Sequence, residues 1–285
     1  TNVSPNAIPS GWDPGLKHQC VKSVFPSQPN GYEDLTDCPK AGQSWTRANQ
    51  SEVELSQTCS QVNGQSLPVN SPNSPLSISW SDDSNGGKVV RLINDQVTTP
   101  HPCSGRTFSW FAFMDNIAHG GGPFPRPHLL EQYGSYLYRA ESEHLGYSRM
   151  GVSWAGFWDN SSFFVEINLY TNQNWGDNHP DPDVIWRTVL PDNTLFVLLD
   201  GSKMPQDYSL ALNEPREINV KWHEVIDDLV DRNLLPTPSQ GFTHSATGSV
   251  NVFTEIDNLG NHPSAKADLT VKDLTIFEKP VERSA

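Results

Sequence analysis

The chain has 285 residues, with 33 acidic and 19 basic side chains and a formal net charge of −14. This charge argues against binding to nucleic-acid backbones or anionic membrane surfaces, and it disfavours polyanionic sugars. The length fits one large β domain or two smaller ones, and no run of about 18 apolar residues predicts a membrane span. We therefore expect a monomer that recognises a neutral polysaccharide or oligosaccharide, with no nucleic-acid or membrane partner.

Residues 1–80 are rich in Pro, Ser, Asn and Gln and weakly periodic, which predicts a loop-rich extension integrated with the domain that follows. All four cysteines (Cys20, Cys38, Cys59 and Cys103) lie in the first 103 residues, without the paired spacing of a zinc site. They predict two disulfides, and we favour Cys20–Cys38 with Cys59–Cys103 among the pairings that four cysteines allow. Disulfides predict a secreted or periplasmic protein whose signal peptide has been removed.

Residues 81–280 alternate short strand-like runs with turns, which predicts an all-β domain. The expected architecture is a jelly roll or sandwich of two antiparallel sheets. The predicted strands cover residues 88–93, 106–114, 151–158, 163–170, 194–199, 249–256 and 268–277. In the last of these the apolar positions change parity near Lys272 and Asp273, which predicts a β-bulge.

One amphipathic helix is predicted over residues 221–232. Its apolar stripe has helical spacing and is suited to packing on a sheet; it consists of Trp222, Val225, Ile226, Leu229 and Val230. Asn219 is expected to cap the start of this helix, and Asn233 to adopt the left-handed conformation after its end. The sequence thus predicts a single helix in a β protein.

Two glutamates lie in otherwise apolar strand-like runs. Strand side chains alternate between two faces, so Glu166, Asn168 and Tyr170 should share one face, and Glu255 should face away from its apolar neighbours. Taken alone, a glutamate on a half-exposed strand is more often a solvated residue than a catalyst. Two of them on the polar faces of strands in one sandwich are a candidate carboxylate pair.

The order of the C-terminal half resembles the glycoside hydrolase family 12 endoglucanases and xyloglucanases, over residues 105–278. The nucleophile strand of that family, Glu-x-Met-x-Trp, is similar to Glu166-Ile167-Asn168-Leu169-Tyr170, and its acid/base strand is similar to Phe253-Thr254-Glu255, with Gly260 in the following turn. The resemblance implies a concanavalin-like jelly roll with one helix packed on the convex side. It further implies a retaining endo-hydrolase of a neutral β-glucan-like polysaccharide, with Glu166 as nucleophile and Glu255 as acid/base. Asn168 and Tyr170 depart from the family's Met and Trp.

A retaining glycosidase needs its two carboxyl groups ~5–5.5 Å apart, and the acid needs a raised pKa. Asn168 is expected to orient Glu166 or to bond a sugar hydroxyl, with Tyr170 beside it. Four tryptophans are candidate sugar-stacking platforms, although a large aromatic in a strand is usually a core residue; they are Trp110, Trp154, Trp158 and Trp175.

Three further hypotheses stay open. The first is a non-catalytic lectin or carbohydrate-binding module on the same fold. The second is a polysaccharide lyase, whose base and neutralising groups would come from Tyr136, Tyr138, Arg139 and His144. The third is a structural calcium ion in the acidic loop 177–183, with an ordinary acidic turn as its alternative. No other cofactor and no catalytic metal is expected.

Overall fold

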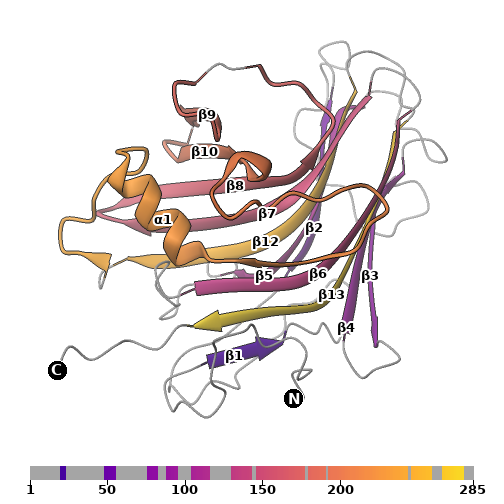
Figure 1. The fold of residues 1–285 in the computed structure, drawn as a ribbon, viewed down its shortest axis with the longest axis horizontal. Helices are drawn as coiled ribbons and strands as arrows, with labels where there is room; N and C mark the ends of the chain where they lie inside the picture. The colour runs from indigo at the N-terminus through magenta and orange to yellow at the C-terminus, as the bar shows by residue number, and fades with distance from the viewer. Residues whose placement is uncertain are drawn as a thin grey trace.

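A computed structural model describes residues 20–23, 48–55, 76–82, 88–95, 104–115, 130–142, 146–176, 179–190, 192–242, 245–258 and 265–278. These residues form two stacked sheets with one α-helix at one end (Figure 1). Over the described ranges, the predicted all-β sandwich with a single α-helix is therefore confirmed. No helix in the described part of the chain is long and apolar enough to cross a membrane.

The first sheet has the order β11-β6-β13-β4-β3, and β1 pairs with β13 outside this path. Its strands are β1 (Cys20–Ser23), β3 (Leu76–Asp82), β4 (Lys88–Asp95), β6 (Leu130–Ser142), β11 (Arg216–Val220) and β13 (Ala265–Glu278). In β13 the register shifts between Lys272 and Thr275, which confirms the predicted bulge. The sequence did not predict β6, whose apolar alternation is interrupted by tyrosines, a glycine and charged residues, or β11, which has only five residues.

The second sheet has the order β2-β5-β12-β7-β8-β10-β9. Its strands are β2 (Ala48–Leu55), β5 (Ser104–Asp115), β7 (Gly146–Trp158), β8 (Ser161–Thr171), β9 (Val184–Val189), β10 (Leu195–Asp200) and β12 (Ala246–Asn258). One pair departs from the prediction of wholly antiparallel sheets, because β10 runs parallel to β8. The chain crosses from β8 to β9 at the edge and returns as β10 between them.

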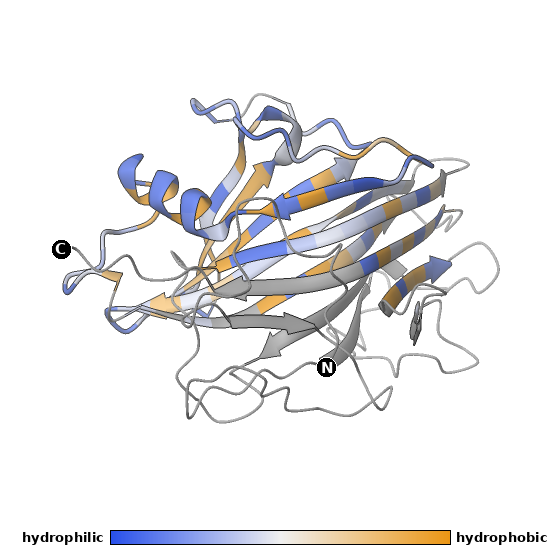
Figure 2. Cartoon of the chain, turned by 60° about the horizontal axis from the view of Figure 1, so that its bottom comes forward, coloured by the Kyte–Doolittle hydropathy of each residue, from blue (hydrophilic) through white to orange (hydrophobic). Residues whose placement is uncertain are grey.

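The core fills the space between the sheets with alternate residues of each strand, as the period-2 pattern requires. Hydrophobic and hydrophilic segments alternate along the described strands (Figure 2). The first sheet contributes Val90, Leu92, Tyr136, Tyr138, Leu269 and Val271, and the second contributes Val152, Trp154, Val165, Ile167, Val250 and Val252. Since these residues use one parity of β7, β8 and β12, the other parity is left for polar groups.

The helix α1 (Trp222–Asp231) buries its predicted apolar stripe against this core. Trp222 Nε1 donates to Gln132 Oε1 on β6 at 2.9 Å. Asn233 adopts the predicted left-handed conformation, with φ of 59°. The predicted cap is wrong: Lys221 takes the N-cap position, and Asn219 lies on β11, where it donates to Glu131 at 2.6 Å.

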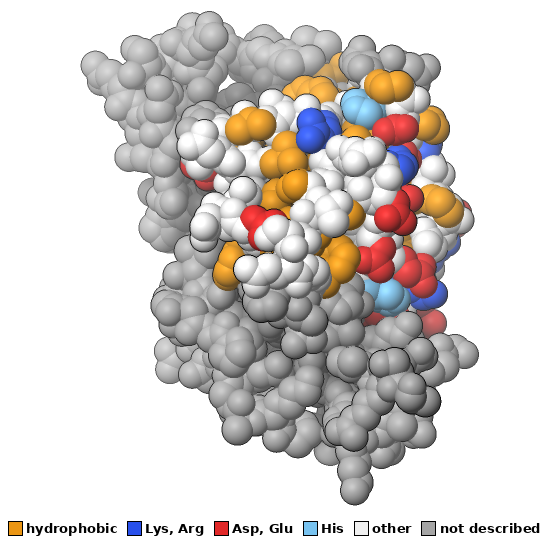
Figure 3. Space-filling model, turned by 90° about the vertical axis from the view of Figure 1, so that its left-hand side faces the viewer, with side chains coloured by type: hydrophobic (Ala, Val, Ile, Leu, Met, Phe, Trp, Pro, Cys, Tyr) orange, Lys and Arg blue, Asp and Glu red, His pale blue; other side chains and the backbone are white. Residues whose placement is uncertain are grey.

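The exposed face of α1 is acidic, and acidic side chains gather at one margin of the surface seen from this side of the molecule (Figure 3).

The strands β1 and β2 show that segments before residue 80 pair with both sheets. The side chains of the four cysteines are not among the described ones, so the predicted disulfides stay a prediction.

Candidate functional site

Three neighbouring strands of the second sheet, β12, β7 and β8, carry a polar face turned away from the core. Arg149 on β7 lies opposite Glu255 on β12, and Ser153 lies opposite Glu166 on β8 and Asn251 on β12. Residues of the same parity share a face, so these five side chains form one group, called here the polar face. The two predicted glutamates are therefore on the same side of one sheet, with β7 between them.

Arg149 joins the two glutamates directly. Its Nη1 donates to Glu166 Oε2 at 2.8 Å and to Asn168 Oδ1 at 3.0 Å, while its Nη2 donates to Glu255 Oε2 at 2.7 Å. Because both carboxylates contact terminal nitrogens of one guanidinium, their nearest oxygens lie no more than about 8 Å apart. The carboxylate pair expected from the sequence is thus brought together, with an arginine between its members.

These charges are held away from water. The exposed fractions are 4% for Glu166, 4% for Glu255 and 8% for Arg149. Burial acts to lower the pKa of Arg149, but the charges and hydrogen bonds of both glutamates outweigh it and raise the pKa above its ordinary value. Arg149 is therefore a fixed cation in contact with both carboxyl groups.

The guanidinium is placed by its packing as well as by its bonds. Its Cζ lies 5.0 Å from the centre of the buried Phe253 ring, within the range of a cation–π contact. Gly151, two residues along β7, leaves room for this arrangement. A Cβ there would come within 2.1 Å of the Ile167 carbonyl oxygen and 2.9 Å of the Phe253 ring. A glycine is thus required where β7, β8 and the ring meet.

Asn168 serves Arg149 rather than Glu166. It is 2% exposed, and its Oδ1 accepts the bond from Arg149. Its buried Nδ2 has no hydrogen-bond partner among the described residues, and the same holds for Nε of Arg149. The expectation that Asn168 orients Glu166 is met only indirectly, through the arginine. The alternative expectation, that it bonds a sugar hydroxyl, stays a prediction, and Nδ2 is the donor available for it.

Three of the expected sugar-binding aromatics lie on the core side of the second sheet. Trp154 and Trp158 are at most 2% exposed and belong to the hydrophobic core, so their role as stacking platforms is wrong. Strict alternation predicted Tyr170 on the face of Glu166, and this prediction is wrong. A register shift between Met150 and Gly151 places Tyr170 opposite Met150. Its ring packs 5.2 Å from Tyr138 in the core.

The other two candidate tryptophans, Trp110 and Trp175, lie in different parts of the fold. Trp110 lies on β5 in register with Phe253 of β12, and its side chain is outside the described residues. Trp175 lies in the loop after β8, half-buried, and its ring contacts Trp186 in a T-shaped pair with centroids 5.3 Å apart.

Sequence reasoning missed Arg149 and a set of aromatics at the β9 edge of the second sheet. Phe164 and Phe196 stack at 5.7 Å on neighbouring strands, on the parity of Glu166. Trp186 on β9 is 49% exposed, and Phe157, which is 42% exposed, lies on the inner strand β7. Alternation in residues 163–170 places Phe164 with Glu166, so this signal was present in the sequence. Arg149 carried no such signal, because its strand was predicted to begin at residue 151.

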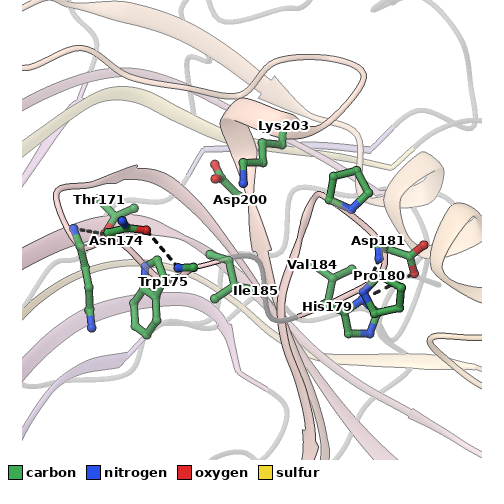
Figure 4. Close-up of a pocket in the computed structure, with 13 residues that line it drawn as sticks. Thr171, Asn174, Trp175, His179, Pro180, Asp181, Val184, Ile185, Asp200 and Lys203 are labelled. Carbon is green, nitrogen blue, oxygen red and sulfur yellow. Dashed lines mark hydrogen bonds and ion pairs between the residues drawn. The ribbon is translucent and has the colours of Figure 1, made fainter.

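A pocket of about 360 Å³ lies between the loop after β8 and the loop before β9. Asn174 and Trp175 line one side, His179 and Asp181 line the other, and Asp200 and Lys203 lie between them (Figure 4). The lining mixes amide, carboxylate, imidazole and ammonium groups with one indole ring.

The lyase hypothesis loses the residues on which it depended, whereas the calcium hypothesis stays a prediction, because Asp177 lies outside the described residues. Tyr136 and Tyr138 are fully buried in the core, and burial raises the pKa of both phenols, so neither is placed as a base; His144 lies outside the described residues. In the acidic loop, Asp183 is bonded by both terminal nitrogens of Arg232 at 2.8 Å. No group of three or more metal-ligating side chains occurs among the described residues.

No family model and no curated protein sequence matches the chain. Among solved structures, it is similar to the xyloglucanase domain of a type three effector from Sinorhizobium fredii in complex with cellobiose, at 12% identity and a TM-score of 0.42 over 90% of this chain and 100% of that one. A native family 12 xyloglucanase from Bacillus licheniformis gives 12% identity and 0.38 over 90% and 100%. A family 11 xylanase from Neocallimastix patriciarum gives 8% and 0.39 over 90% and 98%. Glycoside hydrolases of the expected kind are thus among its structural neighbours.

Proposed function

We propose that the chain is a glycoside hydrolase that cleaves a neutral β-glucan-like polysaccharide by a retaining mechanism, with Glu166 as nucleophile and Glu255 as acid/base. The observation that carries the proposal is the convergence of these two glutamates on Arg149, from strands separated by β7. Retaining glycosidases have their two carboxyl groups ~5–5.5 Å apart, and the limit of about 8 Å between the nearest oxygens admits this separation.

The environment of Glu166 supports the role of nucleophile. A carboxylate attacks the anomeric carbon only when it is ionised, and the bond from Arg149 favours that form. Asn168 helps to hold the same guanidinium nitrogen, so the geometry of the bond is fixed from two sides. Glu166 would then attack the anomeric carbon while the leaving oxygen takes a proton from Glu255.

Glu255 has to carry a proton to act as the acid, and its Oε2 already accepts a hydrogen bond from Arg149. Proton transfer to the leaving oxygen therefore requires the Glu255 carboxyl to exchange the guanidinium for the sugar. This requirement favours a second candidate function, in which the chain binds the same polymers without cleaving them. The observations behind the second candidate are the Arg149 bridge and the burial of all three charged groups.

The test is reducing-end release from mixed-linkage β-glucan, xyloglucan and xylan by the full chain. Glu166→Gln and Glu255→Gln keep the shape of each side chain and remove its charge. Each is expected to lower the rate by about a hundredfold or more. Glu217→Gln, at an exposed glutamate on β11 of the other sheet, is the matched control and should retain the wild-type rate.

Loss of activity in both glutamine variants, with circular dichroism unchanged, supports the hydrolase. Wild-type rates in both variants would contradict it. Binding of a polymer in an affinity gel, with no reducing ends released from any substrate, would select the second candidate.

A further inference from the structure

Trp186 lies on the polar side of the second sheet, in line with Glu166. It pairs with Leu198 of β10, and Leu198 pairs with Glu166 of β8. The three residues therefore occupy one row across the strands, perpendicular to the strand direction. Two strand spacings separate Trp186 from Glu166, which is about 10 Å. A few linked sugar units span such a distance.

The exposure of Trp186 sets it apart from the other described tryptophans on strands. Trp154 and Trp158 are buried in the core, whereas Trp186 leaves 49% of its surface in water on the edge strand β9. The edge of the Trp175 ring supports it in the T-shaped pair. A large apolar ring that the fold leaves half exposed, and that a second aromatic ring contacts, is suited to contact a ligand.

The loop that carries Trp175 is locally fixed. Gly176 N donates to Asn174 Oδ1 at 3.0 Å, and Gln173 N donates to Thr171 Oγ1 at 3.1 Å. Gly176 has φ of 69°, a conformation that favours glycine. The loop thus presents Trp175 to the pocket of about 360 Å³ on one side and to Trp186 on the other.

The pocket lining indicates the class of ligand. Amides of Gln173 and Asn174 both donate and accept, Asp181 and Asp200 accept, and Lys203 donates. Opposite charges occur together, so the lining selects neither an anion nor a cation. Hydroxyl groups, which donate and accept, match such a set, and the indole ring offers a flat apolar surface to the C–H face of a pyranose. A neutral sugar unit combines both properties.

We propose that Trp186, Trp175 and the adjoining pocket bind one unit of a neutral β-linked saccharide whose chain extends from Glu166 to the β9 edge of the sheet. The inference rests on the proposed function for the position of the chain, and adds a binding site outside the carboxylate pair. Phe164 and Phe196, stacked on the same face near Glu166, flank the path between the two.

The test measures binding alone. Isothermal titration of β-1,4-linked glucose oligosaccharides of three and six units is carried out on the chain with Glu166→Gln, so that hydrolysis does not consume the ligand. Adding Trp186→Ala or Trp175→Ala should weaken binding of the six-unit oligosaccharide about tenfold. The three-unit oligosaccharide should lose less, because it can bind at the carboxylate pair alone.

Two further variants serve as controls. Val189→Ala removes another exposed apolar side chain of β9, opposite Leu195 and on the other face, and should leave both affinities unchanged. Trp186→Tyr keeps an aromatic ring and should recover part of the affinity, which separates loss of stacking from loss of fold.

Equal affinities for the six-unit oligosaccharide in Trp186→Ala, Trp175→Ala and Val189→Ala would overturn the inference, and so would the absence of any binding. Reducing-end release lost in Glu166→Gln alongside unaltered binding in Trp186→Ala would uphold the hydrolase and refute the platform. Binding that depends on Trp186, with no hydrolysis by the wild type, would uphold the platform and refute the hydrolase.

Discussion

On the polar face of the second sheet, the side chains at the centre and those at the β9 edge differ in solvent exposure. At the centre, Glu166, Glu255 and Arg149 are all less than 10% exposed, and the single guanidinium forms an ion pair with each carboxylate. At the edge, Trp186 leaves 49% of its surface exposed, with Trp175 half-buried beside it. The same alternation of side chains thus yields a closed charged cluster and an open aromatic margin within a few strands.

On the proposed function, the centre of the sheet would carry the chemistry and the β9 edge would bind the ligand. Charged groups in a low-dielectric site interact strongly, which is useful for stabilising a developing charge, but they require pairing to remain buried. Aromatic rings at an edge strand carry little penalty in water and can meet a ligand before the centre does. The centre should therefore respond to substitution mainly in stability and rate, and the edge mainly in affinity.

The largest expected effect is that of Arg149→Met. It leaves two buried carboxylates without their common cation, which should cost about 3–5 kcal/mol of unfolding free energy in urea denaturation. Arg139→Met, at an exposed position of β6, is the control and should change stability by less than about 0.5 kcal/mol. A loss below about 1 kcal/mol for Arg149→Met would mean that the centre does not depend on this pairing.

Gly151→Ala should come next. The added Cβ meets the Ile167 carbonyl oxygen and the Phe253 ring, so β7 has to shift, at a cost of about 1–3 kcal/mol. Thermal unfolding followed by circular dichroism measures the effect, with the exposed Ser162→Ala on β8 as reference. Equal melting temperatures for the two variants would refute the close approach at Gly151.

The buried phenol of Tyr208, in the hydrophobic core, makes the stability of the fold depend on pH. Burial raises the pKa of Tyr208 from 10.0 to about 12. The neutral phenol favours the folded state, so this contribution is complete below pH 10 and is lost as the pH rises towards 12. Between pH 9 and pH 11 the wild type should lose about 1 kcal/mol more than Tyr208→Phe. Parallel stability curves for the two proteins would contradict the burial of this phenol.

The smallest stability effect belongs to the edge. Trp186→Ala should lower the unfolding free energy by about 1 kcal/mol or less, because the ring is half exposed and its aromatic partner is one side chain. Urea denaturation alongside Arg149→Met measures the ratio directly. A loss as large as that of Arg149→Met would mean that Trp186 is a structural residue.

Much of this arrangement follows from alternation along single strands. The parity of Glu166, Asn168 and Glu255, the apolar stripe of α1 and the left-handed Asn233 were all predictable, because each depends on neighbours within a few residues. Tyr170 was not, because the register shift at Gly151 arises between β7 and β8.

The role of Arg149 could not be predicted from any single segment of the sequence. Its strand was predicted to begin later, and its role depends on two glutamates 17 and 106 residues away. The burial of the tryptophans was likewise only partly predictable. Trp154 and Trp158 shared parity with Val152 and thus belonged to the core, whereas the exposed Trp186 lies on a strand that sequence alone did not predict.

The most direct test of the central claim, that Glu166 and Glu255 have distinct roles at one anomeric carbon, is azide rescue with an aryl β-cellobioside. In Glu166→Gly, azide should take the place vacated by the nucleophile and give the α-glycosyl azide with release of the phenol. In Glu255→Ala, the glycosyl-enzyme forms on Glu166, and azide attack should give the β-azide. Rescue in neither variant, or the two products exchanged between them, would contradict the account.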